Sequence, residues 1–408
     1  MKFIVSQIGA REHYAVARAL HQAGRLDALY TDFWAGRAWR SFARVPGFSK
    51  LRSLAARSHA GLASAPVYSW NLAMLAWEYR LRQHTRTGDR YQGFIEVGQK
   101  FAGAVRDQLR RRRDWPAGTI FFSYDTGALE TLEFLKTRGV PCVVDQMDPS
   151  RVEVDLVCAE AKRWPGWEPA AAPVPEAYFR RREQEWALAD RVVVNSEFSR
   201  RALMQQGVPA EKLVVIPLCY EMHAEAEAVA RPPRDPAAPL RILFLGQVIL
   251  RKGIQYLLAA AKLLESEPVH FDVVGAVGIS ADAVKSAPPN VTFHGRATRA
   301  QVRDWYQRAD VVVLPTLSDG FALTQLEAMA FGLPVIATPN CGAVVTPGED
   351  GLIVPPGDAA ALAGALHRYL TEPKLLAQHQ AGGRGKIRQF SLARLGASLA
   401  ALPAGLVE

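Results

Sequence analysis

The segment from residue 310 to 339 constrains the fold of this chain more than any other. It consists of an apolar run at 310–315, a glycine turn, and a second apolar run at 333–337. Strand, helix and strand in this order predict a parallel α/β sheet, with Gly320 at the start of the helix. Open sheets of this kind bind phosphates and sugars at the carboxyl ends of their strands. Between the runs, apolar residues recur at helical spacing, at Leu323, Leu326, Met329 and Ala330.

Two carboxylates, Asp319 and Glu327, stand eight positions apart in this segment. A helix start offers unpaired N–H groups and a partial positive charge that suit a diphosphate. Asp319 is placed to accept hydrogen bonds from sugar hydroxyls. Glu327 lies roughly 12 Å further along the helix, the span from a hexose to a nucleoside ribose. An isolated pair of this kind also arises as an N-cap Asp and a surface Glu, so the interpretation depends on the whole of 318–338.

A second loop supports the same chemistry. The apolar strand 240–245 is followed by the loop 246–253 and by a helix at 254–264. Its glycines and Lys252 supply a flexible backbone and one cation for a pyrophosphate. The alternative is an ordinary turn in which Arg251 and Lys252 are solvated. The segment with Asp319 and Glu327, later in the sequence, favours diphosphate binding over this alternative.

Residues 318–339 resemble the signature of the retaining glycosyltransferases of family 4. Glu327 and the following Ala-Met-Ala match that signature, whereas Asp319 replaces its first Glu and Ala322 replaces a Gly. The loop 246–253 resembles the family's Gly-Arg…Lys-Gly loop, with Lys252 as its lysine and Gln247 in place of its arginine. The resemblance implies an α/β protein with the GT-B fold, in which two Rossmann-like doubly wound domains face each other.

The domain limits follow from the chain's length and from its alternating strands and helices. The 408 residues exceed what one core usually spans, and strands alternate with helices in both halves. We expect a first domain at 1–220, a Pro- and Ala-rich linker at 221–239, and a donor domain at 240–385. The final helix, within 386–408, is expected to cross back to the first domain.

The resemblance also implies which residues bind the donor and which act in transfer. Lys252 and the helix start at Gly320 are expected to stabilise the leaving diphosphate, and Gly9 is expected to let the ligand approach the backbone. The residues expected to bind the donor are Gly9, Gly246, Gln247, Arg251, Lys252, Asp319, Gly320, Phe321, Ala322, Leu323, Thr324 and Glu327.

The first domain supplies less certain catalytic candidates, because the family's histidine after a middle strand is absent. Asp145-Gln-Met-Asp-Pro149 stands there instead. Asp148 or Asp145 is expected to face the interdomain cleft, although Asp148 equally suits a helix cap. His13, in the first loop between strand and helix, is a further catalytic candidate, with a plain surface residue as the alternative.

No cofactor or metal is expected. The chain has no Asp-x-Asp in a donor loop and no cluster of His or Cys at ligand spacing. The prediction is therefore a metal-independent enzyme that uses a UDP-, GDP- or ADP-sugar.

The uneven distribution of basic residues indicates which kinds of partner the protein binds. The net charge is +9, and residues 33–77 contain no Asp or Glu while Arg and Lys alternate with Trp and Phe. Arg110–Arg113 adds a compact cationic run. This pattern suits an anionic membrane surface or a polyprenyl-diphosphate acceptor, and a solvated helical face is the alternative. The standard nucleic-acid-binding motifs do not appear, so no nucleic acid is expected.

Location follows from three absences in the sequence. No run reaches 18 apolar residues, the N-terminus lacks the apolar core of a signal peptide, and the four cysteines are dispersed. These features predict a cytoplasmic protein, peripheral on the inner face of the membrane.

The preferred function is a retaining glycosyltransferase that moves a sugar to a glycan or polyprenyl-linked acceptor. A sugar-nucleotide epimerase of the same fold is one alternative. A catalytically weak sugar-nucleotide-binding protein is another, motivated by Asp319, Gln247 and the absent histidine.

Overall fold

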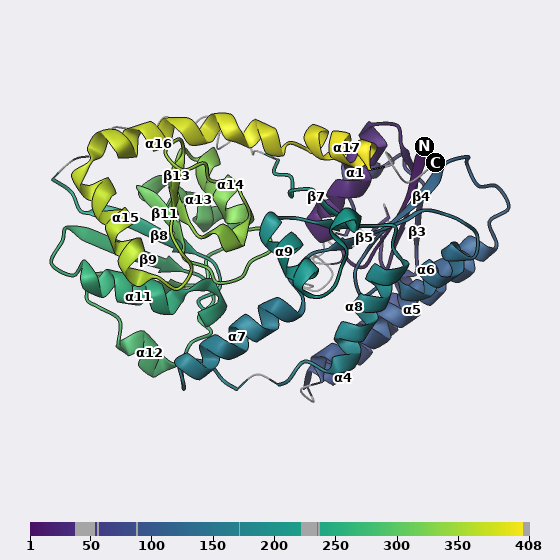
Figure 1. Ribbon diagram of the computed structural model, residues 1–408, viewed down its shortest axis with the longest axis horizontal. Helices are drawn as coiled ribbons and strands as arrows, with labels where there is room; N and C mark the ends of the chain where they lie inside the picture. The colour runs from purple at the N-terminus through teal and green to yellow at the C-terminus, as the bar shows by residue number, and fades with distance from the viewer. Residues whose placement is uncertain are drawn as a thin grey trace.

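The protein consists of two α/β domains, each built around a parallel sheet (Figure 1). The computed structural model describes residues 1–36, 54, 57–86, 89–170, 172–221, 235 and 237–402. The N-terminal sheet has the order β3-β2-β1-β4-β5-β6-β7, and the C-terminal sheet has the order β10-β9-β8-β11-β12-β13. Both begin as 3-2-1-4-5-6, the doubly wound Rossmann arrangement, so the predicted fold class is confirmed.

The N-terminal strands are continuous hydrophobic runs because helices cover both faces of the sheet. Its strands are β1 (Lys2–Gln7), β2 (Leu26–Thr31), β3 (Val67–Ser69), β4 (Thr119–Tyr124), β5 (Cys142–Gln146), β6 (Arg191–Val194) and β7 (Leu213–Val215). Its helices are η1 (Arg11–Tyr14), α1 (Ala15–Gln22), η2 (Ala60–Leu62), α4 (Asn71–Arg86), α5 (Arg90–Arg110), α6 (Leu129–Lys136), α7 (Arg151–Arg163), α8 (Glu176–Leu188), α9 (Glu197–Gln205) and η3 (Ala210–Lys212).

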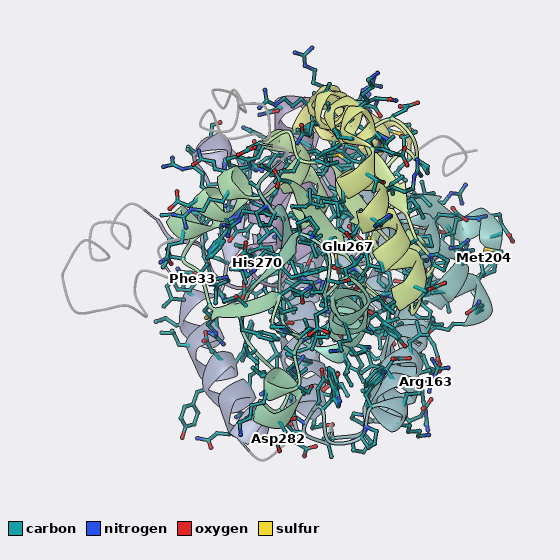
Figure 2. The ribbon with its side chains drawn as sticks, turned by 90° about the vertical axis from the view of Figure 1, so that its left-hand side faces the viewer. Phe33, Arg163, Met204, Glu267, His270 and Asp282 are labelled. Carbon is teal, nitrogen blue, oxygen red and sulfur yellow. The ribbon has the colours of Figure 1, made fainter. Side chains whose placement is uncertain are left out.

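The C-terminal domain has the same plan, a parallel sheet between helices. Figure 2 shows the molecule turned by 90° from the view of Figure 1. Its strands are β8 (Leu240–Leu245), β9 (Val269–Val274), β10 (Val291–Gly295), β11 (Val311–Leu314), β12 (Val335–Ala337) and β13 (Gly351–Ile353). Its helices are η4 (Leu250–Lys252), α11 (Ile254–Leu263), α12 (Ala281–Lys285), α13 (Arg299–Arg308), α14 (Leu323–Ala330), η5 (Pro339–Cys341), α15 (Ala359–Thr371) and α16 (Pro373–Lys386).

The end of the chain returns to the first domain, as expected. After α16 and η6 (Ile387–Phe390), helix α17 (Leu392–Ala401) lies on α1 (Figure 1). The approach is close, because a Cβ added at Gly396 would lie 3.3 Å from the carbonyl oxygen of Ala19. Of the predicted crossing segment, residues 403–408 lie outside the described part of the chain.

Two other predictions fall mostly outside the described residues. These are the linker at 221–239 and much of the basic segment at 33–77. Among the helices that are described, none has the length and hydropathy that crossing a bilayer requires.

Candidate functional site

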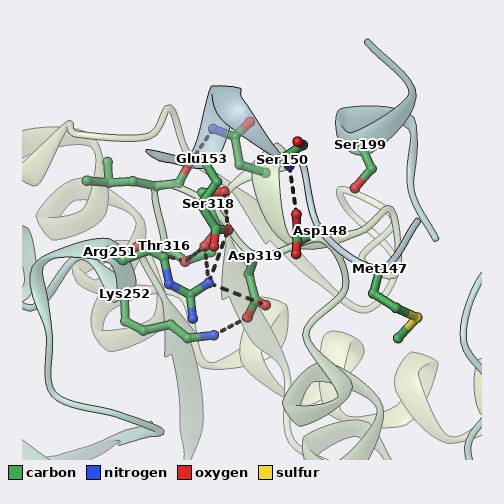
Figure 3. A network of polar contacts seen from close by, with 12 residues as sticks. Met147, Asp148, Ser150, Glu153, Ser199, Arg251, Lys252, Thr316, Ser318 and Asp319 are labelled. Atoms are coloured by element: carbon green, nitrogen blue, oxygen red, sulfur yellow. Dashed lines mark hydrogen bonds and ion pairs between the residues drawn. The ribbon is translucent and has the colours of Figure 1, made fainter. Parts of the chain in front are cut away.

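The two loops singled out in the sequence meet at one point in the C-terminal sheet. The strand order changes direction between β8 and β11, so the loops that follow these neighbouring strands lie at the same edge. There the Nζ of Lys252 forms an ion pair with Asp319 (Figure 3). Each of the two side chains is 19% exposed. The loops are also joined through their backbones, because the N–H of Leu317 donates to the carbonyl oxygen of Arg251 at 2.9 Å.

The loop 246–253 passes close to the end of the neighbouring strand β9, and only glycine fits at that point. Gly275 has a φ of +150°, and a Cβ at this position would lie 1.6 Å from the carbonyl oxygen of Gly246. No heavy atom lies within 4 Å of a Cβ built on Gly246 itself, so this face of the loop is open. The side chain of the neighbouring Gln247 is exposed.

The expectation that the helix begins at Gly320 is wrong. Helix α14 begins at Leu323, and Ala322 is its N-cap. The N–H groups of Asp319 and Ala322 instead donate to the carbonyl oxygens of Asn340 and Cys341, at 3.0 and 2.9 Å. These bonds hold the segment extended against η5, and the helix therefore starts later.

The delayed helix still leaves several amide donors at the edge of the sheet. The side chain of Phe321 is buried, so this residue offers a ligand its backbone N–H and not its ring. Within the described ranges, no hydrogen-bond acceptor is recorded for the N–H groups of Gly320, Phe321, Leu323 and Thr324. Unpaired donors beside Lys252 are suited to an anionic ligand.

Glu327, the second carboxylate, is held by a residue that the sequence did not single out. The hydroxyl of Tyr306 in α13 donates to its Oε2 at 2.7 Å. Tyr306 is 1% exposed and stacks on Phe331 with ring centroids 5.2 Å apart. Burial, and then the neighbouring Glu327 carboxylate, raise the pKa of Tyr306 well above its usual value, so the hydroxyl stays a donor. This bond engages only one oxygen of Glu327, and binding of the donor by this residue stays a prediction.

Arg251 connects the two domains. Its Nη1 donates to the carbonyl oxygen of Ser318 at 2.8 Å and pairs with Glu153 of α7 at 3.4 Å (Figure 3). The hydroxyl of Ser318 also donates to Glu153, at 2.8 Å. The guanidinium of Arg251 is therefore engaged across the domain boundary, and diphosphate binding by this residue stays a prediction.

Helix α7 carries further contacts to the C-terminal domain. The Oε2 of Glu160 accepts hydrogen bonds from Tyr256 and Gln255, at 2.8 and 3.1 Å. At the opposite end of α7, the carbonyl oxygen of Met147 would lie 2.7 Å from a Cβ on Gly320. The N-terminal domain thus closely approaches the loop that carries Asp319.

The first loop of the N-terminal domain is strained. Glu12, His13 and Tyr14 all have left-handed backbones, with φ of 48°, 51° and 62°. His13 is exposed. The N–H of Gly9 donates to Asp32 at 2.8 Å, and no heavy atom lies within 4 Å of a Cβ built on Gly9, so its Cα faces open space.

The two aspartates near the missing histidine differ in environment. Asp148 accepts from the N–H of Ser150 at 2.8 Å and binds both Nη atoms of Arg182. Burial opposes ionisation of Asp148, but Arg182 keeps its pKa below the usual value. Asp145 is 6% exposed, and burial, followed by the nearby Glu12 and Asp125, raises its pKa well above the usual value. Asp148 thus has a structural role at the start of α7, and its catalytic role stays a prediction.

Known proteins resemble this chain in sequence and in fold. Residues 239–372 match the family model described as Glycosyl transferases group 1. The D-inositol 3-phosphate glycosyltransferase of Xylanimonas cellulosilytica is 28% identical over 314 residues, 71% of this chain and 72% of that protein. The enzyme of the same name from Nocardiopsis dassonvillei is 32% identical over 232 residues, 49% of this chain and 52% of that protein. The chain thus spans about half the length of several curated relatives, 55% for that of Streptomyces bingchenggensis.

Solved structures share the whole architecture. Anabaena Alr3699/HepE in complex with UDP matches with a TM-score of 0.59 and 16% identity, over 99% of this chain and 100% of that one. The lipopolysaccharide outer core galactosyltransferase WaaB matches with a TM-score of 0.59 and 15% identity, over 98% of each chain. Residues 239–372 thus resemble the group 1 glycosyltransferases in sequence, and the whole chain shares the fold of these solved structures.

Glu12 is expected to make the stability of this protein depend on pH. Burial, opposed by Arg11, raises the pKa of Glu12 from 4.5 to about 7. The folded state therefore binds more protons than the unfolded state between these values, and the free energy of unfolding falls as the pH rises from 4.5 to 7. Replacing Glu12 with glutamine should remove this loss and raise the stability at pH 8 by up to about 3 kcal/mol. Urea unfolding at pH 4.5 and pH 8 measures the effect. The exposed Glu211→Gln is the control, and a gain for Glu12→Gln that is equal at both pH values would contradict the prediction.

Proposed function

We propose that this protein is a retaining, metal-independent glycosyltransferase. It moves a sugar from a nucleotide-diphosphate sugar to a glycan or polyprenyl-linked acceptor. The observation that carries the proposal is the meeting of Lys252, Asp319 and the amide donors of 320–324 at the switch point of the C-terminal sheet. UDP-glucose is the first donor to test, because Alr3699/HepE was solved with UDP and with UDP-glucose.

The chemical role of Lys252 is electrostatic. An ammonium group has three donors, and Asp319 engages one of them, so the others are available to the leaving diphosphate. The amides of Gly320 and Phe321 add fixed dipoles at the same place. Such preorganised donors stabilise the negative charge that develops as the anomeric bond breaks. The departing phosphate then takes the proton of the acceptor hydroxyl, on the same face of the sugar.

Activity on a donor panel tests the function. Purified protein is incubated with UDP-, GDP- and ADP-sugars and candidate acceptors in the presence of EDTA, and release of the nucleotide diphosphate is measured. NMR of the product reports the anomeric configuration. The proposal predicts turnover with retention in EDTA. Inversion, or strict dependence on a divalent metal, would refute the corresponding part, and nucleotide binding with no turnover would favour the sugar-nucleotide-binding alternative.

Tyr306 is proposed to position Glu327 for the ribose of the donor. Tyr306→Phe removes only the hydroxyl bonded to Glu327 Oε2, and it is expected to raise the donor KM about fivefold with little change in kcat. Tyr369→Phe is the matched control, because Tyr369 is a fully buried tyrosine of the same domain whose hydroxyl bonds to His379. Steady-state kinetics on both variants measures the donor KM and kcat and so tests whether Tyr306 positions Glu327. An equal change of KM in the two variants would leave Tyr306 with a purely structural role.

Peripheral membrane binding is proposed for the surface formed by α4. Leu72, Leu75 and Tyr79 are 82%, 42% and 65% exposed and lie on one side of the helix. An exposed apolar stripe on a helix that follows a cationic stretch in the sequence suits an anionic bilayer. Leu72→Glu combined with Tyr79→Glu should abolish sedimentation with phosphatidylglycerol vesicles, whereas Met204→Glu, also at an exposed position, should not. If the wild-type protein remains in the supernatant at low salt, membrane docking is wrong.

A further inference from the structure

A small pocket lies in the N-terminal domain, at the carboxyl ends of β1, β4 and β5. Its volume is about 240 Å³. It opens beside the point where the strand order of this sheet changes direction, between β1 and β4, the position at which such sheets bind ligands. The pocket is lined by Ile8, Arg11, Leu81, Phe94, Val97, Asp125, Thr126, Asp148, Tyr178 and Arg182.

The polar side of the pocket has no net charge. Arg182 is 4% exposed and pairs with both Asp148 and Asp125, at 2.7 and 2.6 Å. Arg11 also faces Asp125, at 3.7 Å. Two guanidinium groups thus face two carboxylates. A phosphate in the pocket would have to displace a carboxylate from one of these pairs, which is costly for groups as buried as Arg182.

One carboxylate oxygen in this pocket lacks a hydrogen bond. Asp125 is 3% exposed, and its Oδ1 has no hydrogen-bond partner. The 3.7 Å that separates this atom from Nη1 of Arg11 is too long for a hydrogen bond. A ligand hydroxyl between them could donate to Asp125 and accept from Arg11, whose side chain is 34% exposed. A buried acceptor without a partner is otherwise unfavourable.

Part of the pocket lining is apolar and aromatic. Ile8, Val97 and Phe94 line it. The rings of Phe94 and Tyr178 lie 6.4 Å apart, and the guanidinium of Arg182 lies 4.6 Å from the centroid of Tyr178. A lining that offers C–H and ring surface together with paired charges matches a ring with hydroxyls on its edge and C–H groups on its face.

The pocket lies next to the donor loop. Asp148 follows Met147, whose carbonyl oxygen would lie 2.7 Å from a Cβ on Gly320. Figure 3 shows Asp148 in the same close view as Asp319 and Lys252. A ring held in the pocket would therefore lie near the amide donors that are proposed to bind the diphosphate.

We propose that this pocket binds the acceptor as an uncharged polyhydroxylated ring, a sugar or a cyclitol without a phosphate. This inference rests on the proposed glycosyl transfer and specifies its acceptor. The relatives reported above are named for an inositol phosphate. The pocket of this chain differs from what such an acceptor needs, because each lining guanidinium already faces a carboxylate.

Saturation-transfer NMR in the presence of UDP, GDP or ADP tests the proposal. The probes are methyl α-glucopyranoside and myo-inositol, each compared with a phosphorylated counterpart, glucose 6-phosphate and inositol 3-phosphate. The uncharged rings are expected to bind and the phosphates are not. Binding of the phosphates alone, or of none of the four probes, would overturn the inference.

Two variants locate the binding. Arg11→Gln removes the donor that faces Asp125 and should weaken ring binding about tenfold. Val97→Phe fills the pocket from α5 without touching its ion pairs and should abolish binding. Arg200→Gln, an arginine of similar exposure (30%) paired with Glu197 on α9, is the control. Undiminished ring binding in both pocket variants would refute the assignment.

Calorimetry with the nucleotide diphosphates separates this inference from the proposed function. If the protein binds none of UDP, GDP and ADP, the donor assignment fails. If a nucleotide binds and its sugar is turned over while the uncharged rings do not bind, only the acceptor inference fails. Retained nucleotide binding in Arg11→Gln and Val97→Phe also shows that these variants are folded.

Discussion

Replacing Lys252 with alanine is expected to lower kcat for sugar transfer by roughly 100- to 1,000-fold. This is the usual loss when one preorganised donor to a developing anion is removed. The ammonium pairs with Asp319, next in sequence to the amide donors of Gly320 and Phe321, whereas the guanidinium of Arg251 pairs with Glu153 across the domain boundary. Loss of the ammonium also leaves Asp319 with only the more distant guanidinium of Arg251, at 3.9 Å, so a poorly compensated negative charge remains where the diphosphate must bind. Lys252→Arg should recover part of the rate, because it restores the charge with a different geometry.

The control for this experiment is Lys262→Ala. Lys262 lies on α11, is 68% exposed, and pairs with Glu265, so its removal changes the net charge equally without touching the loop. Transfer by the Lys262 variant should be unchanged. Lys252→Ala that retains transfer within about threefold of the wild-type rate would end the assignment of Lys252 to the leaving group.

The sequence predicted the scaffold of the site well, for physical reasons. Buried parallel strands are continuous apolar runs, and the predicted range of β8, 240–245, agrees with the structure at both ends. The meeting of Lys252 with Asp319 was also foreseeable. The loops after neighbouring parallel strands share one edge of the sheet, so two ligand-binding patterns that follow such strands must come together.

What the sequence did not predict depends on tertiary contacts. The start of α14 is set by the carbonyl oxygens of Asn340 and Cys341, which compete for the amides that would otherwise begin a helix at Gly320. The hydrogen bond from Tyr306 to Glu327 depends on how α13 is rotated about its axis relative to α14. The spacing of apolar residues in the sequence predicts which face of a helix is buried, but not which residue of the next helix that face contacts. The three left-handed residues of η1 have no local signal at all, since none of them is glycine.

Replacing Glu327 with alanine is expected to weaken binding of the nucleotide donor about 100-fold. A carboxylate that accepts two hydrogen bonds from the vicinal hydroxyls of a ribose contributes roughly 1.5–3 kcal/mol for each bond, and some of this is recovered by water. Glu327→Gln should cost only about tenfold, because an amide oxygen still accepts one of the two bonds. Calorimetric titration with the nucleotide diphosphate measures all three proteins.

The decisive comparison is between nucleotides with and without the ribose hydroxyls. If Glu327 binds the ribose, a 2′,3′-dideoxynucleotide diphosphate should bind wild type and Glu327→Ala with similar affinity, because the interaction is then absent in both. Glu265→Ala, which removes an exposed carboxylate elsewhere in the domain, should leave both titrations unchanged. A Glu327→Ala defect that is equally large for the dideoxy compound would place the effect in the packing of α14 on Tyr306. In that case the carboxylate holds the helix and does not recognise the sugar of the nucleotide.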